Sequence, residues 1–321
     1  MKPIHIKWVL AHEPIDIFIR AAEKFKEVVE AKAPGQFEIE VLTLSEYSDK
    51  YNSAITEDNA NRISKHDLLD HMDDGRIEMS QMYTYVLSKY NNDLDALDLP
   101  FLFRDHDHAA KVFEGAIGEE LLAGYTRNSN IQGMAFTYSG GFMNMPVNRQ
   151  ITSLSEMAGV NVRVSNSPVA SATWAALGAN PVVMDVERVT EGIREGTIDA
   201  GESSWPRIYA CQQNEVAESI LEPNHRLLLT NIIINKDFLS GLTVEQQQVM
   251  KQAALEAGRF ERAVAVAEVE PTKARCEQDG IPVVRLSADD EQLFRNKSEQ
   301  VYVQFANAFT PGLVESIRTL Q

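Results

Sequence analysis

The N-terminal third of the chain alternates between strand-like and helix-like segments, and this order restricts the fold more than any other feature. Strand-like segments show alternating apolar and polar residues, and the helix-like ones show apolar residues at helical spacing. The segments are strand Ile4–Ala11, helix Ile15–Lys32, strand Phe37–Leu44, helix His66–Gly75 and strand Ile77–Met82. This order predicts a mostly parallel sheet with helices on its faces.

A second α/β lobe follows. The stretch 161–184 reads strand, turn, helix, turn, strand, with Ser167 as a helix N-cap, Pro168 at the first helical position and Gly178 at the end. Another helix and a strand are predicted at Val186–Glu195 and Ile198–Ala200.

The last third contains one long apolar strand and one long helix. The strand is Arg226–Asn235, and Thr243–Glu270 carries apolar residues at helical spacing. At 1.5 Å per residue this helix would be about 42 Å long, enough to bridge two lobes. We expect Pro271 to kink or end it. We therefore divide the chain into residues 1–137 (main part of lobe 1), 138–225 (main part of lobe 2) and 226–321, a segment shared between the lobes.

Composition excludes several classes of protein. The chain has 30 Lys and Arg against 47 Asp and Glu, a net charge of −17, which argues against nucleic acid and anionic membranes as partners. Its longest apolar runs, such as Leu227–Ile234, are too short to span a bilayer, so no membrane insertion is expected.

No nucleotide-binding, zinc or nucleophile motif is present, and we expect no cofactor, no metal and no enzymatic activity. Cys211 and Cys276 are too few for a disulfide scaffold, and whether they pair stays open.

Arg163 is the residue that fits its surroundings least. It stands between Val162 and Val164 in a segment that otherwise reads as a buried strand. A buried guanidinium keeps its charge and needs an anionic or strongly accepting partner. One interpretation is an internal ion pair, with Glu156, Asp185 or Glu202 as candidates. The other is a ligand carboxylate, which the planar fork of arginine binds through both oxygens.

Two carboxylates stand at the end of the strand that begins at Ile198. Asp199 and Glu202 stand at a strand end, where side chains of α/β lobes commonly line a cleft, and Trp205 comes shortly after. A capped loop is the structural interpretation of the same residues. A hydrolase or lyase that uses Asp199 and Glu202 as acid and base is the non-binding alternative. No nucleophile or electrophile pattern accompanies the pair.

Three segments, in order, resemble one known family. They are DLPFLFRDHDHAAKVFEG (98–115), GVNVRVSNSPVASATWAALGANPVVM (159–184) and EGIREGTIDAGE (191–202). On these segments the chain resembles the solute-binding subunits of tripartite ATP-independent periplasmic (TRAP) transporters, the DctP-like proteins, and the likeness covers nearly the whole chain.

The resemblance implies a two-lobed periplasmic-binding-protein fold of the α/β class, with a ligand cleft between the lobes that closes by hinge bending. It implies a small organic acid as ligand, held by the arginine that matches Arg163, and integral membrane TRAP permease subunits as partners. A periplasmic location is also implied. No signal peptide is visible after Met1, and on this interpretation it has been removed.

Departures from the family pattern bear on the ligand. Met143 stands where the family often has a second arginine, and Ser203 and Ser204 stand where it often has Asn-Pro. Losing a cation disfavours a doubly charged ligand. We therefore predict a monocarboxylate, with a sugar acid such as an aldonate or uronate as the lead. The predicted contacts are Arg163, Glu202, Glu13, Asn144, Trp205 and Ser203.

Two other ligand classes remain open. A zwitterion, such as an amino acid or an ectoine-like solute, would place its cation near Glu13 and Glu202 and against the ring of Trp205. A C4-dicarboxylate is the third possibility.

Overall fold

The computed structural model describes residues 2–11, 16–51 and 62–321, and the chain forms two compact units. Unit 1 consists of Met1–Asn91, Gly118–Tyr138 and Leu229–Val264. Unit 2 consists of Asn92–Ile117, Ser139–Leu228 and Ala265–Gln321. Each unit is thus assembled from three separate stretches of chain. Residues 92–117 belong to unit 2, whereas the division made from the sequence kept 1–137 together.

Unit 1 is built on a five-stranded sheet with the order β2-β1-β3-β10-β4. Strand β1 pairs in parallel with β2 and β3, and β10 pairs antiparallel with β3. The parallel strand–helix pattern predicted for the first third is therefore confirmed. The strands are β1 (Ile4–Leu10), β2 (Phe37–Thr43), β3 (Met79–Tyr83), β4 (Ile131–Phe142) and β10 (Leu227–Asn235). The helices are α1 (Asp16–Lys32), α2 (Leu44–Tyr51), α3 (Lys65–Asp73), α4 (Thr84–Leu87), α6 (Ala116–Ala123), α10 (Lys236–Gly241) and α11 (Val244–Ala267).

Unit 2 is built on a six-stranded sheet with the order β11-β9-β5-β8-β6-β7. Its strands are β5 (Met145–Val147), β6 (Asn161–Val164), β7 (Asn180–Val183), β8 (Ala200–Gly201), β9 (Ser219–Glu222) and β11 (Val283–Arg285). Its α-helices are α5 (His106–Glu114), α7 (Pro168–Ala176), α8 (Val189–Glu195), α9 (Trp205–Ala210), α12 (Val269–Gln278), α13 (Ala288–Gln304) and α14 (Leu313–Thr319). Short 3-10 helices include η1 (Asn92–Asp98) and η5 (Gln213–Glu215).

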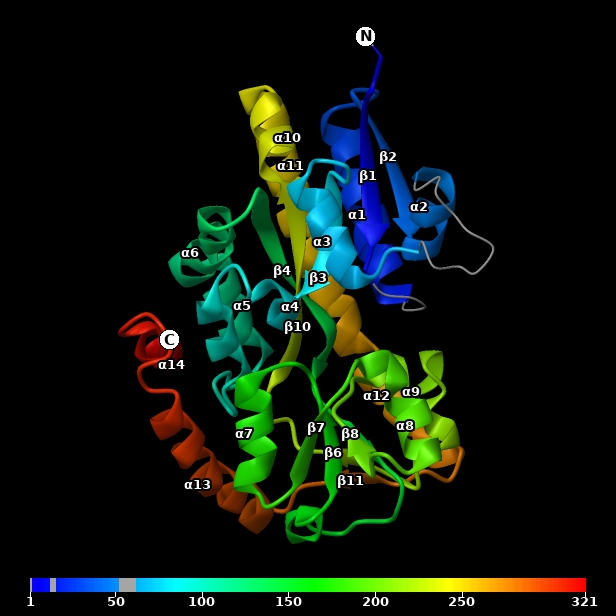
Figure 1. Ribbon diagram of the computed structural model, residues 1–321, viewed down its shortest axis with the longest axis vertical. Coiled ribbons are helices and arrows are strands. Elements are labelled where there is room, and N and C mark those ends of the chain that lie inside the picture. Colours follow the sequence, from blue (N-terminus) through cyan, green and yellow to red (C-terminus); the bar gives the residue numbers. More distant parts are fainter. Residues whose placement is uncertain (1, 12–15, 52–61) are drawn as a thin grey trace. The chain divides into compact units, whose positions relative to one another are not determined.

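The two faces of the unit 2 sheet are covered by different helices (Figure 1). On one face, Val162 and Val164 pack in a buried cluster with Trp174 of α7 and Phe294 of α13. We call this the α7 face. On the other face, Ile220 packs in a cluster with side chains of α9 and α12: Trp205, Ile208 and Cys276. We call this the α9 face. Since successive strand residues point to opposite faces, the register decides which polar side chains share a face.

The long helix predicted near the C-terminal third is interrupted once. Helix α11 ends at Ala267 and α12 resumes at Val269. Pro271 causes the break, because it cannot donate to the carbonyl of Ala267, four residues earlier, and its ring would collide with that oxygen. At the third position of α12 the missing N–H costs little. The predicted interruption by Pro271 is confirmed. Helix α11 begins in unit 1, and its last residues belong to unit 2.

The described part of the chain also bears on membrane spans and on the two cysteines. Within it, no helix combines the length and apolarity needed to cross a membrane. Cys211 and Cys276 are both free thiols, and burial raises the pKa of each.

Candidate ligand-binding site

Arg163 is buried in the middle of the unit 2 sheet. It lies on β6, paired with Val182 of β7 and Gly201 of β8, and only 2% of its surface is exposed. Its Nε donates to the backbone oxygen of Met184 at 2.6 Å, and its Nη1 donates to the backbone oxygen of Glu202 at 3.0 Å. These two bonds fix the plane of the guanidinium. Neither of them neutralises its charge, because both acceptors are backbone carbonyls.

Asn144 and Ser203 share the α9 face with Arg163. The two residues form an antiparallel bridge, with Asn144 N donating to Ser203 O at 3.2 Å and Ser203 N to Asn144 O at 2.8 Å. Residues that face each other in such a bridge point to the same side of the sheet. Ser203 lies two residues beyond Gly201, the partner of Arg163, so it also points to the side of Arg163. Three of the predicted contact residues are therefore brought to one face.

The polar groups of Asn144 and Ser203 are fully buried. Both residues have 0% exposure. Ser203 Oγ donates to Gln213 Oε1 at 2.7 Å. Among the residues that the structure describes, neither Nδ2 nor Oδ1 of Asn144 has a hydrogen-bond partner, nor has Nε2 of Gln213. Buried amides are nearly always paired, so these three atoms are the strongest local signal for a missing polar group.

Glu202 points to the opposite face from Arg163. Ala200, two residues earlier, belongs to the buried cluster of the α7 face. Residues two apart along an extended chain point to the same side, so Glu202 also points to the α7 face. The carboxylate Oε1 accepts from Trp174 Nε1 at 2.9 Å and from His225 Nε2 at 2.9 Å. Arg226 donates to Oε2 through Nη2 at 2.5 Å and to Oε1 through Nε at 3.2 Å. Burial disfavours the carboxylate, but Arg226 and His225 outweigh it and hold the pKa of Glu202 well below its usual range.

Arg226 connects Glu202 to a second acid. Its Nη1 donates to Asp98 Oδ1 at 2.6 Å, and its Nη2 also donates to Ser165 Oγ at 3.3 Å. All of these side chains are buried within unit 2. Beside them, His225 stacks on Phe294 with ring centroids 5.3 Å apart, and burial lowers its pKa. The Glu202 carboxylate is therefore held and balanced on the α7 face by the chain itself.

Most of the chain matches one known protein family. Residues 10–308 match the model of the DctP family, described as bacterial extracellular solute-binding protein, family 7. The chain belongs to this family. It is a periplasmic solute-binding protein of the TRAP type and not an enzyme. The two-lobed α/β fold expected from the resemblance is confirmed, and the acid–base alternative for Asp199 and Glu202 has no support.

Relatives and solved structures agree with this assignment. The C4-dicarboxylate-binding periplasmic protein DctP of Rhodobacter capsulatus is 28% identical over 274 residues, which is 84% of this chain and 76% of the relative. The 2,3-diketo-L-gulonate-binding periplasmic protein of Escherichia coli is 25% identical over 265 residues, 82% of this chain and 76% of the relative. A TRAP periplasmic solute-binding protein from Ochrobactrum anthropi, with its C-terminus bound in the ligand pocket, has a TM-score of 0.84 and 25% identity. That match covers 98% of this chain and 94% of the other.

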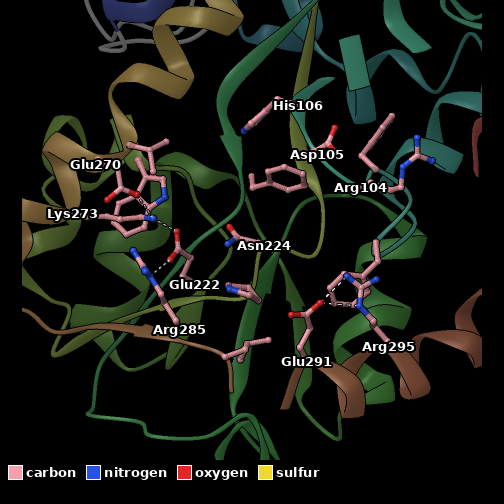
Figure 2. Close-up of a pocket in the computed structure, with 17 residues that line it drawn as sticks. Arg104, Asp105, His106, Glu222, Asn224, Glu270, Lys273, Arg285, Glu291 and Arg295 are labelled. Atoms are coloured by element: carbon pink, nitrogen blue, oxygen red, sulfur yellow. Dashed lines mark hydrogen bonds and ion pairs between the residues drawn. The ribbon is translucent and has the colours of Figure 1, made fainter. Parts of the chain in front are cut away.

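Trp205, another predicted contact of this solute-binding protein, lines a separate cavity of unit 2. Figure 2 shows this cavity, with Glu222, Lys273 and Arg295 among its labelled residues. The cavity has a volume of about 630 Å³ and carries as many carboxylates as permanent cations. Lys273 lies over the Trp205 ring, with Nζ 5.3 Å from the ring centroid. Lys273 pairs with Glu222 and, at 3.0 Å, with Glu270. Since the chain's own lysine covers this ring, Trp205 offers little surface for the cation of a ligand.

Six of the eight permanently charged side chains of this cavity are paired with one another. Arg285 Nε lies 3.3 Å from Glu222 Oε2, and Arg295 Nη2 lies 2.7 Å from Glu291 Oε1. Such a lining has no excess charge of either sign to attract an acid. We therefore take the α9 face around Arg163, and not this cavity, as the candidate ligand site.

Two other residues singled out in the sequence are Asp199 and Glu13. Asp199 Oδ2 accepts from the backbone N of Asn161 at 2.9 Å, so it fixes the start of β6. Glu13 lies outside the described residues. Three of the six predicted contacts, Arg163, Asn144 and Ser203, therefore point to the α9 face of the sheet. Trp205 packs on the same face from α9 but lines the separate cavity, and Glu202 points to the α7 face.

Sequence reasoning missed three buried polar residues. Arg226 could have been found in the same way as Arg163, because its charged side chain stands directly before a long apolar strand. Arg207 of α9 is fully buried, donates to Ser139 Oγ at 3.5 Å, and has its pKa lowered to about 10 by burial. Gln213 carried no signal, because a lone glutamine in a polar turn is ordinary.

Proposed function

We propose that this solute-binding protein captures a hydroxylated monocarboxylate, such as an aldonate or uronate, and delivers it to a TRAP permease. In this proposal Arg163 binds the carboxylate, and Asn144 and Ser203 contact the rest of the ligand. Glu202 has no direct role in binding. It supports Arg163 from the opposite face, through its backbone oxygen.

The observation that carries the proposal is that Arg163 and Asn144 leave the same face of the sheet. The guanidinium is oriented by two backbone carbonyls, and the carboxamide is buried with both polar atoms unpartnered among the described residues. A guanidinium binds a carboxylate through two parallel hydrogen bonds. A carboxamide offers one acceptor and one donor group, which suits hydroxyl groups. A sugar acid carries both kinds of group on one small molecule.

A zwitterion finds less support in unit 2. Its cation needs a carboxylate or an aromatic face. The carboxylate of Glu202 is held by Arg226, His225 and Trp174, and the ring of Trp205 is covered by Lys273. Two of the three groups expected to receive the cation are thus occupied by the chain's own side chains.

A C4-dicarboxylate is the second candidate, because unit 2 holds another buried guanidinium. Helix α9 follows Ser203 and Ser204 directly and carries Arg207, which reaches Ser139 of β4. With a pKa of about 10 it stays charged at neutral pH. The two curated relatives named above bind a C4-dicarboxylate and a keto sugar acid, respectively. Both classes therefore belong in the test.

Thermal unfolding with a panel of small solutes tests the proposal. The panel contains D-gluconate, D-glucuronate, succinate, ectoine and L-glutamate. A ligand at 100 times its Kd stabilises the folded protein by about 2.7 kcal/mol. We expect the largest shift with a sugar acid. A shift with succinate alone would establish the dicarboxylate instead, and a shift with ectoine or L-glutamate alone would establish a zwitterion and refute the sugar acid.

A further inference from the structure

The proposed site contains two buried amides whose hydrogen-bonding atoms are incompletely used. Asn144 and Gln213 are both 0% exposed. Asn144 Nδ2 and Oδ1 and Gln213 Nε2 have no partner in the part of the chain that the structure describes. We call these two residues the amide pair. Native proteins leave few buried polar atoms unpaired, and a group of three beside a candidate anchor requires an explanation.

Ser203 holds the amide pair together. Its backbone bridges to Asn144, and its hydroxyl donates to Gln213 Oε1 at 2.7 Å. Because Oε1 is already an acceptor for Ser203, the free hydrogen-bonding capacity of Gln213 is its NH2 group. The pair therefore offers two NH2 donors and one carbonyl acceptor, on the face to which Arg163 also points.

The turn before η5 directs Gln213 toward the sheet. Gln212 has a φ of +55°, a left-handed conformation uncommon for residues other than glycine. The turn continues into η5, where the Gln213 carbonyl accepts from Val216 N at 3.2 Å and from Ala217 N at 3.1 Å. The backbone of Gln213 is thus fixed by its own turn, and its side chain is fixed at one end by Ser203.

The chemistry of the amide pair distinguishes among ligand groups. A second carboxylate would use the NH2 donors but would face the Asn144 oxygen with another acceptor. An ammonium would use that oxygen but would face two NH2 groups with further donors. A hydroxyl both donates and accepts, so two or more hydroxyls satisfy all three atoms.

We propose that Gln213, together with Asn144, selects acids that carry hydroxyl groups over acids of the same charge and length that lack them. This inference rests on the proposed binding of an acid by Arg163. It adds Gln213 as a specificity-determining residue and names a polyhydroxylated carboxylate as the ligand class.

Calorimetric titration with D-gluconate and hexanoate tests the inference, because both are six-carbon monocarboxylates and differ in their hydroxyls. The quantity of interest is the ratio of the two Kd values, in which general losses of affinity cancel. We expect the folded wild-type protein to prefer gluconate by at least about 100-fold, because unpaired buried amides reject the analogue that lacks the hydroxyls. Gln213→Met and Asn144→Leu should each reduce that ratio at least about tenfold, mainly by weakening gluconate.

Gln292→Met serves as the matched control, because Gln292 lies exposed on α13 and should leave the ratio unchanged. If one variant fails to fold, the other still decides. An unchanged ratio in the folded variants would overturn the inference and would mean that ordered water satisfies the amide pair. A wild-type protein that binds both acids equally would also overturn it, while the proposed acid binding stands. No binding of any acid by the wild-type protein would refute the proposed function itself.

Discussion

Arg163 of β6 and Glu202, the residue directly after β8, are hydrogen-bonded neighbours, yet their side chains leave opposite faces of the unit 2 sheet. Glu202 N donates to Arg163 O at 3.0 Å, and Arg163 Nη1 donates back to Glu202 O at 3.0 Å. The carboxylate of Glu202 instead meets Arg226 on the α7 face. The sheet therefore separates an internally balanced ion network from the arginine proposed to bind the ligand.

Replacing Glu202 by glutamine should destabilise the fold far more than it weakens ligand binding. The substitution leaves the buried Arg226 with one carboxylate instead of two, and breaking a buried pair costs about 3–5 kcal/mol. The backbone oxygen that holds Arg163 is unchanged, so affinity for the acid should stay within about threefold. Chemical denaturation and calorimetric titration measure the two effects.

Glu191→Gln is the control for this experiment. Glu191 pairs with Arg188 at 3.2 Å on the surface, where both side chains are more than half exposed. Such a pair contributes at most about 1 kcal/mol, so this variant should resemble the wild-type protein. A Glu202→Gln protein that keeps its stability but loses the acid would show that the carboxylate belongs to the ligand site.

Stability should fall as pH drops below about 6.5, in part through His225. Burial lowers the pKa of His225 in the folded protein, so below its ordinary pKa the unfolded chain binds a proton that the folded chain does not. The free energy of unfolding therefore decreases with falling pH, by at most about 1.4 kcal/mol per pH unit for one such group. Glu202 adds a second decrease below about pH 4.3, because its folded pKa is also depressed.

The His225→Gln variant isolates the first of these two effects. Glutamine keeps an NH2 donor for Glu202 and does not titrate. Since His71 and His106 also have pKa values lowered by burial, the variant should flatten the pH profile between 6.5 and 5 without levelling it. Denaturant midpoints across this range provide the measurement, and identical slopes in the two proteins would contradict a buried neutral His225.

A methyl group at Gly201 should disturb Arg163. A Cβ there would lie 2.9 and 3.0 Å from the two γ carbons of Val189 and 3.4 Å from the Cβ of Arg163. We expect Gly201→Ala to cost about 1–3 kcal/mol of stability and to weaken acid binding. Gly241→Ala, where a Cβ meets nothing within 4 Å, should change stability by less than about 0.5 kcal/mol. Equal melting temperatures for the two variants would argue against tight packing beside Arg163.

Local pattern was sufficient to predict the architecture of the chain. The alternation in β1 and β2, the apolar stripe of α1 and the break at Pro271 each depend on a few neighbouring residues, and each was predicted. The unpredicted features depend on register. Glu202 and Ser203 are adjacent in sequence and point to opposite faces, and only the pairing with β5 and β6 decides which one accompanies Arg163.

The partners of buried charged residues could not be predicted from the sequence either. From the sequence, Glu202 was a candidate partner of Arg163, but Arg226 was not recognised as the residue that neutralises Glu202. Arg226 stands 24 positions later, and no local pattern links the two. Lys273 and Trp205 are likewise far apart in sequence, and their contact emerges only when α12 packs beside α9.

Titration of the Arg163→Lys variant with the sugar acid that gives the largest thermal shift tests the central claim most directly. Lysine keeps the charge but loses the fork that takes both carboxylate oxygens. Disrupting a buried, hydrogen-bonded charge pair costs about 2–5 kcal/mol, so affinity should fall by at least about 30-fold while the variant still folds. Wild-type affinity in a folded Arg163→Lys protein would show that Arg163 does not bind the ligand.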